Sequence, residues 1–319
     1  DKNKYLSNCL INVLVIIFLV ICVDAIYQYF TDYNFFGFSK YSTFRLTGLF
    51  GDEPIVGRYI SYLTLFIFAL IYQNYKQTKK IIIASVSLLI ISEVTVFLSG
   101  ERSPLFYLIL FSIFIIIYNK KYRNYRLISI MISIAIISII SLINTNAKTR
   151  IIDLSLSQTS QTNISFLPYS GHHEEHYISA LKMFNDKPIF GIGTNLFRYK
   201  CSYPKYEYKK NIGSCSTHPH NYYIQVLAEL GIVGFLFLVS FFSYLFFIIL
   251  RQFILLIRSR TDKLMPFEVF LYPLILFVYW WPIIPHMSLY NNWNNVLMML
   301  PLGFLMRYLY GSSKNGNFK

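Results

Sequence analysis

A histidine–asparagine pair followed by two glycines is the stretch of this chain whose residue types point most directly to chemistry. His220 and Asn221 are followed, after nine residues, by Gly231 and Gly234. A neutral imidazole can accept a proton from a hydroxyl group near neutral pH, and a neighbouring carboxamide can orient the ring or its substrate. The pair predicts a general base at His220. The structural alternative is a turn in which the histidine is incidental.

An amphipathic helix is expected to carry this histidine. Pro219 suits the first turn of a helix, and Thr217 or His218 can cap its free amides. Polar residues then recur every four positions, at Asn221, Gln225 and Glu229. The pattern predicts a helix along a membrane surface, which Gly231 and Gly234 turn into the apolar run 235–250.

Two arginines near the ends of apolar runs are candidates for binding an anion. Arg102 lies in a tight turn at 99–104, and Arg45 precedes the second apolar run. A guanidinium fork binds phosphate oxygens bidentately and can offset the charge of a leaving diphosphate without a metal. The alternative is salt bridging, of Arg102 with Glu93 or Glu101 and of Arg58 with Asp24.

Histidines and cysteines suggest two further sites. His172 and His176 stand one helical turn apart beside Glu174, but Tyr177 occupies the position at which a zincin helix needs its second histidine. We therefore expect a polar helix face and no metal.

Cys201 and Cys215 flank a polar excursion at 202–214 and predict a disulfide, worth about 3 kcal/mol in the chain-entropy model. Cys9 and Cys22 lie in the first apolar run and are expected to pack as small apolar groups.

The elements that position these residues are membrane helices. The chain is 55% hydrophobic and only 14% charged. Eight apolar runs approach the length of a bilayer span, at 9–29, 56–71, 81–98, 105–118, 127–143, 234–250, 267–284 and 296–310. We predict an all-α, polytopic transmembrane helical bundle with a large, partly helical outer loop. Its parts are helices 1–5 over 1–143, the outer loop with the histidine motif over 144–233, and helices 6–8 with a tail over 234–319.

Lysine and arginine set the expected orientation, because short basic loops stay in the cytoplasm. The basic residues of the predicted cytoplasmic loops and tail are Lys76, Lys79, Lys80, Lys120, Lys121, Arg123, Arg126, Arg251, Arg258, Arg260, Lys263, Lys314 and Lys319. All six histidines then fall on the outer side. Part of the net charge of +14 comes from these basic cytoplasmic loops. Nucleic-acid binding is therefore not expected. The chain begins with Asp1 and has no signal peptide, so we expect upstream spans to be missing.

A non-enzymatic membrane transporter is the competing class. It would place ionisable residues near the middle of its spans, whereas the spans expected here have none at mid-depth. This pattern favours an enzyme.

Four motifs in their order resemble those of the O-antigen ligase and O-antigen polymerase family. They are the histidine motif with its glycine pair, the arginine turn at 99–103, the segment 45–48 before a span, and the Lys-Pro-Ile-Phe-Gly-Ile-Gly segment at 187–193. The resemblance covers residues 44–250, and the histidine motif is its most specific part.

The resemblance implies a glycosyltransferase of the bacterial inner membrane whose active site faces the periplasm. Such an enzyme takes a glycan from undecaprenyl diphosphate and passes it to a sugar hydroxyl, on lipid A–core in a ligase or on a growing polysaccharide in a polymerase. It needs no nucleotide sugar or other cofactor. By this analogy His220 is the general base, while Arg102 and Arg45 hold the diphosphate.

One segment departs from the family's pattern. Members often carry an arginine early in the helix before the Pro-x-x-Gly-x-Gly turn, where this chain reads Gly-His-His-Glu-Glu-His at 171–176. His173 is a weaker candidate for that phosphate contact, and Arg198 is a possible substitute. His218, beside the motif, is also a candidate for binding substrate.

Overall fold

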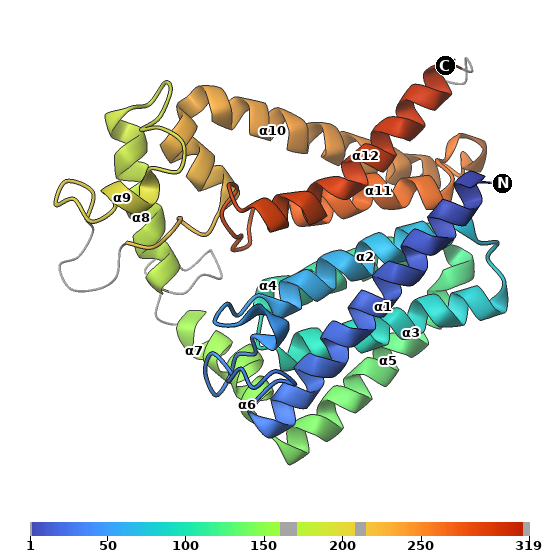
Figure 1. Ribbon diagram of the computed structural model, residues 1–319. Helices are drawn as coiled ribbons and strands as arrows, with labels where there is room; N and C mark the ends of the chain where they lie inside the picture. The colour runs from blue at the N-terminus through green and yellow to red at the C-terminus, as the bar shows by residue number, and fades with distance from the viewer. Residues whose placement is uncertain (1, 160–170, 208–214, 315–319) are drawn as a thin grey trace. The chain divides into compact units, whose positions relative to one another are not determined.

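The computed structural model describes residues 2–159, 171–207 and 215–314 and is all-α over these ranges, being 74% helical with no strands. The chain forms two compact units (Figure 1). The first comprises Asp1–Asp153, Ile248–Tyr279 and Leu297–Lys319, and the second comprises Leu154–Phe247 and Trp280–Val296.

Helices occupy all eight predicted spans. In the described ranges five are long and apolar enough to cross a membrane: α1 (Lys2–Thr31), α2 (Val56–Asn74), α3 (Lys79–Leu98), α5 (Lys120–Ile143) and α10 (Tyr222–Ile257). Two shorter apolar helices, α4 (Arg102–Tyr118) and α11 (Phe267–Tyr279), and the last helix, α12 (Asn292–Lys314), occupy the remaining predicted positions. The chain is a multi-pass membrane protein, as its composition predicts.

Helix α2 is the centre of the first unit. It packs against α1, α3, α4 and α11, and Figure 1 shows α1 to α5 lying side by side. A helix that is apolar on all faces is expected to be surrounded by others, and most of α2 is buried. The hydroxyl of Thr64 is satisfied within the helix, since Thr64 Oγ1 donates to Ile60 O at 2.7 Å.

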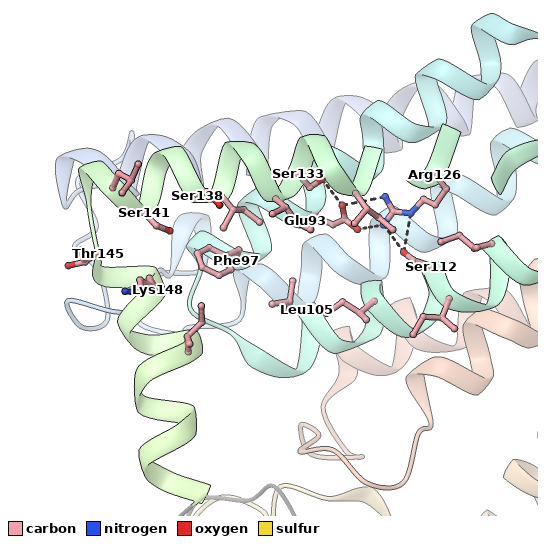
Figure 2. Close-up of a pocket in the computed structure, with 18 residues that line it drawn as sticks. Glu93, Phe97, Leu105, Ser112, Arg126, Ser133, Ser138, Ser141, Thr145 and Lys148 are labelled. Carbon is pink, nitrogen blue, oxygen red and sulfur yellow. Dashed lines mark hydrogen bonds and ion pairs between the residues drawn. The ribbon is translucent and has the colours of Figure 1, made fainter. Parts of the chain in front are cut away.

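Arg126 corrects one sequence-based assignment. We predicted it in a cytoplasmic loop, but α5 already begins at Lys120, where Asn119 accepts a bond from Tyr122 N at 3.2 Å. Arg126 therefore lies inside the helix, is fully buried and forms an ion pair with Glu93. The alternative in which Glu93 pairs with Arg102 is accordingly wrong, because Glu93 pairs with Arg126 (Figure 2).

The second unit has a hydrophobic core of its own. It contains α8 (Gly171–Asp186), the short helix α9 (Phe197–Lys200) and the first part of α10. Its buried residues come from all of these segments: Ala180, Met183, Ile192, Phe197, Cys201, Tyr206 and Ala228. The predicted disulfide between Cys201 and Cys215 is present. The described parts of the long loop are thus partly helical, as predicted, and they share a core.

Candidate functional site

His220 lies two residues before the start of helix α10, in a strained backbone conformation. Its φ is +57°, a region in which histidine is tolerated better than most non-glycine residues. Asn221 caps the helix, because its Oδ1 accepts bonds from Tyr223 N at 3.0 Å and Ile224 N at 3.2 Å. The predicted helix start at Pro219, capped by Thr217 or His218, is therefore wrong. A residue with positive φ cannot continue a right-handed helix, so α10 starts two residues after His220.

Three other imidazoles surround the ring of His220. The ring centroid of His218 lies 4.1 Å from that of His220, and those of His173 and His176 lie at 5.3 and 5.4 Å. We call these four residues the histidine cluster. His173 and His176 come from α8, so residues more than 40 positions apart in sequence meet here. The side chain of His172 lies outside the described residues.

The segment that follows α11 holds the histidine cluster in place. His286 N donates to the carbonyl of His220 at 2.7 Å, and the ring Nε2 of His218 lies 3.2 Å from the carbonyl oxygen of His286. Asn221 Nδ2 donates to the carbonyl of Pro282 at 2.8 Å. Both polar ends of the Asn221 side chain are thus engaged in fixing the backbone around His220. No local sequence pattern pointed to this segment, apart from the placement of His286 on the same predicted side as the other histidines.

Gly231 produces the predicted turn between the two parts of α10. Its φ is +66° and its ψ is −162°, which breaks the helix. A Cβ at Gly231 would overlap the carbonyl of Ile189, and a Cβ at Gly191 would overlap the backbone of Glu229. The turn at 187–193 is joined to the kink by the bonds Ile192 N to Ala228 O at 3.0 Å and Gly193 N to Glu229 O at 3.0 Å. The turn at 187–193 and the glycine pair of the histidine motif therefore meet in one backbone-to-backbone contact.

Two further predicted site residues, Arg198 and His173, belong to the second unit. Arg198 is exposed on α9, and no contact described for it reaches the histidine cluster. His173 is half-buried within that cluster.

Arg45 and Arg102 belong to the first unit, where a turn at Gly100 brings their segments together. Arg102 is the first residue of α4, and Leu46 N donates to Ser99 O at 3.2 Å. Gly100 has a φ of +73°, and a Cβ there would overlap the carbonyl oxygen of Phe44. The tight turn expected around Arg102 is therefore present.

A third arginine, Arg150, joins these two. It lies in a π-helical turn (Thr149–Asp153) after α5, and its carbonyl accepts a bond from Arg102 Nη2 at 3.1 Å. Burial and the positive charge of Arg45 lower the pKa of Arg150. We call Arg45, Arg102 and Arg150 the arginine cluster. Arg150 was missed because nothing in its local sequence reveals that the chain after α5 returns to the α3–α4 turn.

The carboxylate of Glu101 lies near the arginine cluster. Glu101 is buried, and its Oε1 accepts a bond from Gly57 N at 2.6 Å. Burial raises the pKa of Glu101, and Arg45 and Arg58 oppose that rise. Three clustered guanidinium groups repel one another, and Glu101 offsets only part of their charge. The arrangement suits the binding of an anion with more than one negative charge.

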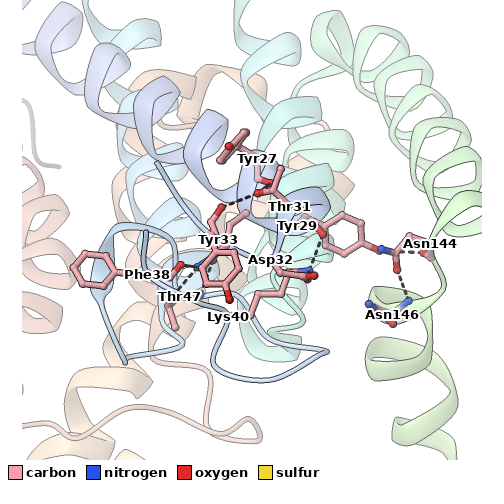
Figure 3. A network of polar contacts seen from close by, with 11 residues as sticks. Tyr27, Tyr29, Thr31, Asp32, Tyr33, Phe38, Lys40, Thr47, Asn144 and Asn146 are labelled. Carbon is pink, nitrogen blue, oxygen red and sulfur yellow. Dashed lines mark hydrogen bonds and ion pairs between the residues drawn. The ribbon is translucent and has the colours of Figure 1, made fainter. Parts of the chain in front are cut away.

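Gln28 fixes the segment that carries Arg45. Fully buried in α1, it accepts bonds from Thr47 N at 3.0 Å and Gly48 N at 2.8 Å and donates to Thr47 Oγ1 at 3.0 Å. Figure 3 shows the neighbouring contacts, in which Lys40 Nζ donates to Tyr29 O at 2.7 Å and Tyr29 Oη donates to Asn144 O at 3.0 Å. The end of α1 is thus tied both to the loop before α2 and to the end of α5.

Part of the chain matches a known protein family. The family model of O-antigen ligase matches residues 84–239, a range that includes Arg102, Arg150, the histidine cluster and the Gly231 kink. Over these residues the chain is similar to the O-antigen ligase family, which supports its membership of that family. The match supports a membrane glycosyltransferase function of the O-antigen ligase or polymerase type. No curated protein matches the chain.

Proposed function

We propose that this protein transfers a glycan from undecaprenyl diphosphate to a sugar hydroxyl on lipid A–core, at the periplasmic face of the bacterial inner membrane. The observation that carries the proposal is the packing of three imidazole rings around His220. A second positive charge within such a cluster is unfavourable, which favours a neutral ring able to accept a proton. The family match supports the class of reaction.

The reaction needs one proton acceptor and one site for the leaving group. His220 removes the proton from the acceptor hydroxyl as its oxygen bonds to the anomeric carbon of the glycan. The bond from that carbon to the diphosphate breaks, and the lipid diphosphate leaves with the bonding electron pair. Arg102 and Arg45 bind the diphosphate and offset its charge. The acceptor side is bordered by His173, His218 and Asn221. Arg198 is a further candidate for contacting the phosphate.

The second candidate function is polymerisation, in which the acceptor is a growing polysaccharide. Both reactions use the same groups, so the surface polysaccharide of a deletion strain separates them. A ligase defect leaves uncapped lipid A–core and long carrier-linked chains, whereas a polymerase defect leaves caps of a single repeat.

Reconstitution tests the reaction itself. Purified protein in liposomes is given a glycan linked to undecaprenyl diphosphate and lipid A–core, with no nucleotide sugar. The expected product is glycan-capped lipid A–core with release of undecaprenyl diphosphate. If product appears only after a nucleotide sugar is added, the proposed donor is wrong.

Labelling tests the proposed orientation of residues 144–233. A cysteine introduced at Lys182 should react with a membrane-impermeant maleimide in cells whose inner membrane is intact. Cys201 and Cys215 are joined to each other, so they leave little background from this loop. Labelling only after permeabilisation of the inner membrane would place α8 in the cytoplasm and reject the periplasmic site.

A further inference from the structure

The turn between α8 and α9, at 187–193, exposes apolar side chains at its tip. Ile189 and Phe190 are 57% and 74% exposed. Lys187, two residues before Ile189, is also exposed, and Pro188 between them has no N–H group. A basic side chain beside large apolar ones suits the boundary between lipid headgroups and acyl chains, where each finds its preferred surroundings.

Backbone hydrogen bonds join this turn to the point at which α10 bends (Figure 1). Ile232 N donates to Pro188 O at 2.8 Å, and Val233 N donates to Ile189 O at 3.4 Å. Both donors come directly after Gly231, whose positive φ breaks the helix. The depth of the turn in a membrane is therefore set by the depth of the residues that follow Gly231.

The charge pattern of α10 places those residues at the edge of the hydrocarbon layer. Between Glu229 and Arg251 the helix carries no charged residue. About 20 apolar residues are needed to cross the hydrocarbon of a bilayer, and the stretch 230–250 has about that length. Its two ends therefore lie at the two interfaces. Ile232 and Val233 are at the first of them.

Exposed apolar side chains continue from the turn along one face of α10. Val233, Phe237, Tyr244 and Phe247 are 51–81% exposed. They are separated by four, seven and three positions, which places them on one side of a helix. In a membrane protein such a face meets the lipid chains. The tip of the turn, whose Ile189 is bonded to Val233, extends this lipid-facing stripe at its end.

The turn also satisfies its own carbonyl groups, which matters because an unsatisfied carbonyl is costly in hydrocarbon. The carbonyls of three successive residues, 187–189, accept bonds from Gly191, Ile232 and Val233. The bond from Gly191 N to Lys187 O is 2.9 Å long. The tip can thus enter an apolar layer without leaving these carbonyls unpaired.

We propose that the turn is a membrane anchor, which inserts Ile189 and Phe190 into the phospholipid leaflet at which α10 enters the bilayer. Lys187 places its ammonium group among the lipid phosphates, while the neighbouring Asp186 forms an ion pair with Lys205. Helix α8 ends at Asp186, directly before the turn. The anchor therefore fixes the depth of the helix that contributes two imidazoles to the histidine cluster.

The first experiment measures where the tip lies in a bilayer. Phe190→Cys is labelled with the fluorophore NBD in the full chain, in nanodiscs of phosphatidylcholine and phosphatidylglycerol. Cys9→Ser and Cys22→Ser remove the free thiols, while Cys201 and Cys215 are protected by their disulfide.

Two matched positions calibrate the label. Phe237→Cys, 81% exposed on the span, reports contact with acyl chains, and Tyr199→Cys, 64% exposed on α9, reports contact with water. We expect brominated acyl chains to quench the label at Phe190 as they do at Phe237. Aqueous iodide should quench it about fivefold less than at Tyr199, because the tip would lie about 5–10 Å inside the headgroup boundary.

Two results would overturn the proposal. One is iodide quenching at Phe190 as strong as at Tyr199. The other is protection from both quenchers, which would show that protein or glycan covers the tip in place of lipid. The same label is used at both positions, so any tendency of the label itself to enter lipid applies to both.

A second substitution separates an anchor from a turn that α10 merely carries into the interface. Ile189→Asp, made in the Phe190→Cys chain, puts a charge at the edge of the hydrocarbon, and iodide quenching should rise toward the value at Tyr199. Lys187→Arg keeps the positive charge and should leave quenching unchanged. If Ile189→Asp leaves it unchanged as well, α10 alone sets the depth and the tip is no anchor.

A further measurement uses the unaltered protein. Hydroxyl radicals oxidise aromatic side chains that water reaches, and Phe190 and Tyr199 are similarly exposed in the chain itself. Each oxidation rate is divided by that of the same residue in the unfolded chain. In nanodiscs the normalised rate of Phe190 should be about tenfold below that of Tyr199, because lipid excludes water from the tip. Equal normalised rates would contradict the anchor. None of these measurements needs a glycan donor or acceptor, so their outcome is independent of the proposed function.

Discussion

The arginine cluster and the histidine cluster are assembled by the same backbone device. In the first unit Gly100 adopts a positive φ and lies against the carbonyl oxygen of Phe44, and in the second unit Gly231 does so against the carbonyl of Ile189. Each contact brings a loop from elsewhere in the sequence to a helix end. In both regions the backbone, rather than the reactive side chain, determines where the polar groups meet.

The chemistry that the two regions present is different. Guanidinium groups keep their charge at any physiological pH, so the arginine cluster is a permanent site of positive potential. Imidazoles exchange protons near neutral pH, and the histidine cluster can therefore take part in proton transfer. Under the proposed function, anion binding belongs to the first unit and proton transfer to the second. The predictions below test that division.

Replacing His220 should have the largest effect on transfer. Loss of a general base typically lowers the rate by about 10²–10⁴-fold, so His220→Ala should reduce glycan transfer by that order. His220→Asn is the matched control for backbone strain, because asparagine tolerates the positive φ of this position but does not accept a proton near neutral pH. His220→Asn should unfold at the temperature of the unaltered protein, and His220→Ala somewhat below it because alanine tolerates a positive φ less well. Near-normal transfer by either one would refute the assignment of His220 as the base.

Glycine substitutions test whether close backbone approach builds each region. Gly100→Ala and Gly231→Ala introduce a Cβ that overlaps backbone, whereas Gly37→Ala and Gly51→Ala introduce one at positive φ with nothing within 4 Å. All four variants place alanine at a positive φ. The difference in stability between the two pairs therefore measures the cost of the overlap with backbone. We expect the first pair to be less stable than the second by about 1–3 kcal/mol in reversible unfolding. Equal stabilities would show that the loops can shift without cost.

The sequence revealed features that depend on local spacing. The disulfide between Cys201 and Cys215, the turn at Gly100 and the kink at Gly231 each follow from residues close together in the chain. It did not reveal Arg126 as the partner of Glu93, because that pairing depends on how far α5 extends and which face it turns inward. Arg150 was missed for a similar reason, since only tertiary structure brings the chain after α5 to the α3–α4 turn.

A charge-conserving substitution tests whether the arginine cluster binds its ligand by geometry. Arg102→Lys keeps the positive charge but loses the planar guanidinium group, which can donate hydrogen bonds to two phosphate oxygens at once. Loss of one charge-assisted hydrogen bond costs about 1.5–3 kcal/mol, so binding of a lipid diphosphate should weaken by about tenfold or more. Lys40→Arg, at an ion pair with exposed Asp32, is a control that should leave binding unchanged. If Arg102→Lys binds as the unaltered protein does, Arg102 contributes only charge.

The smallest expected effect is that of a chelator, and it bears directly on the division between the two clusters. If arginines offset the charge of the leaving diphosphate, transfer should proceed at an unchanged rate in excess EDTA, because no divalent cation is needed for that task. The histidine cluster supplies the opposing possibility, since imidazoles are common metal ligands. Loss of transfer in EDTA, restored by a divalent cation in the unaltered protein but not in His176→Ala, would move leaving-group stabilisation from the arginine cluster to a metal at the histidine-bearing face of α8.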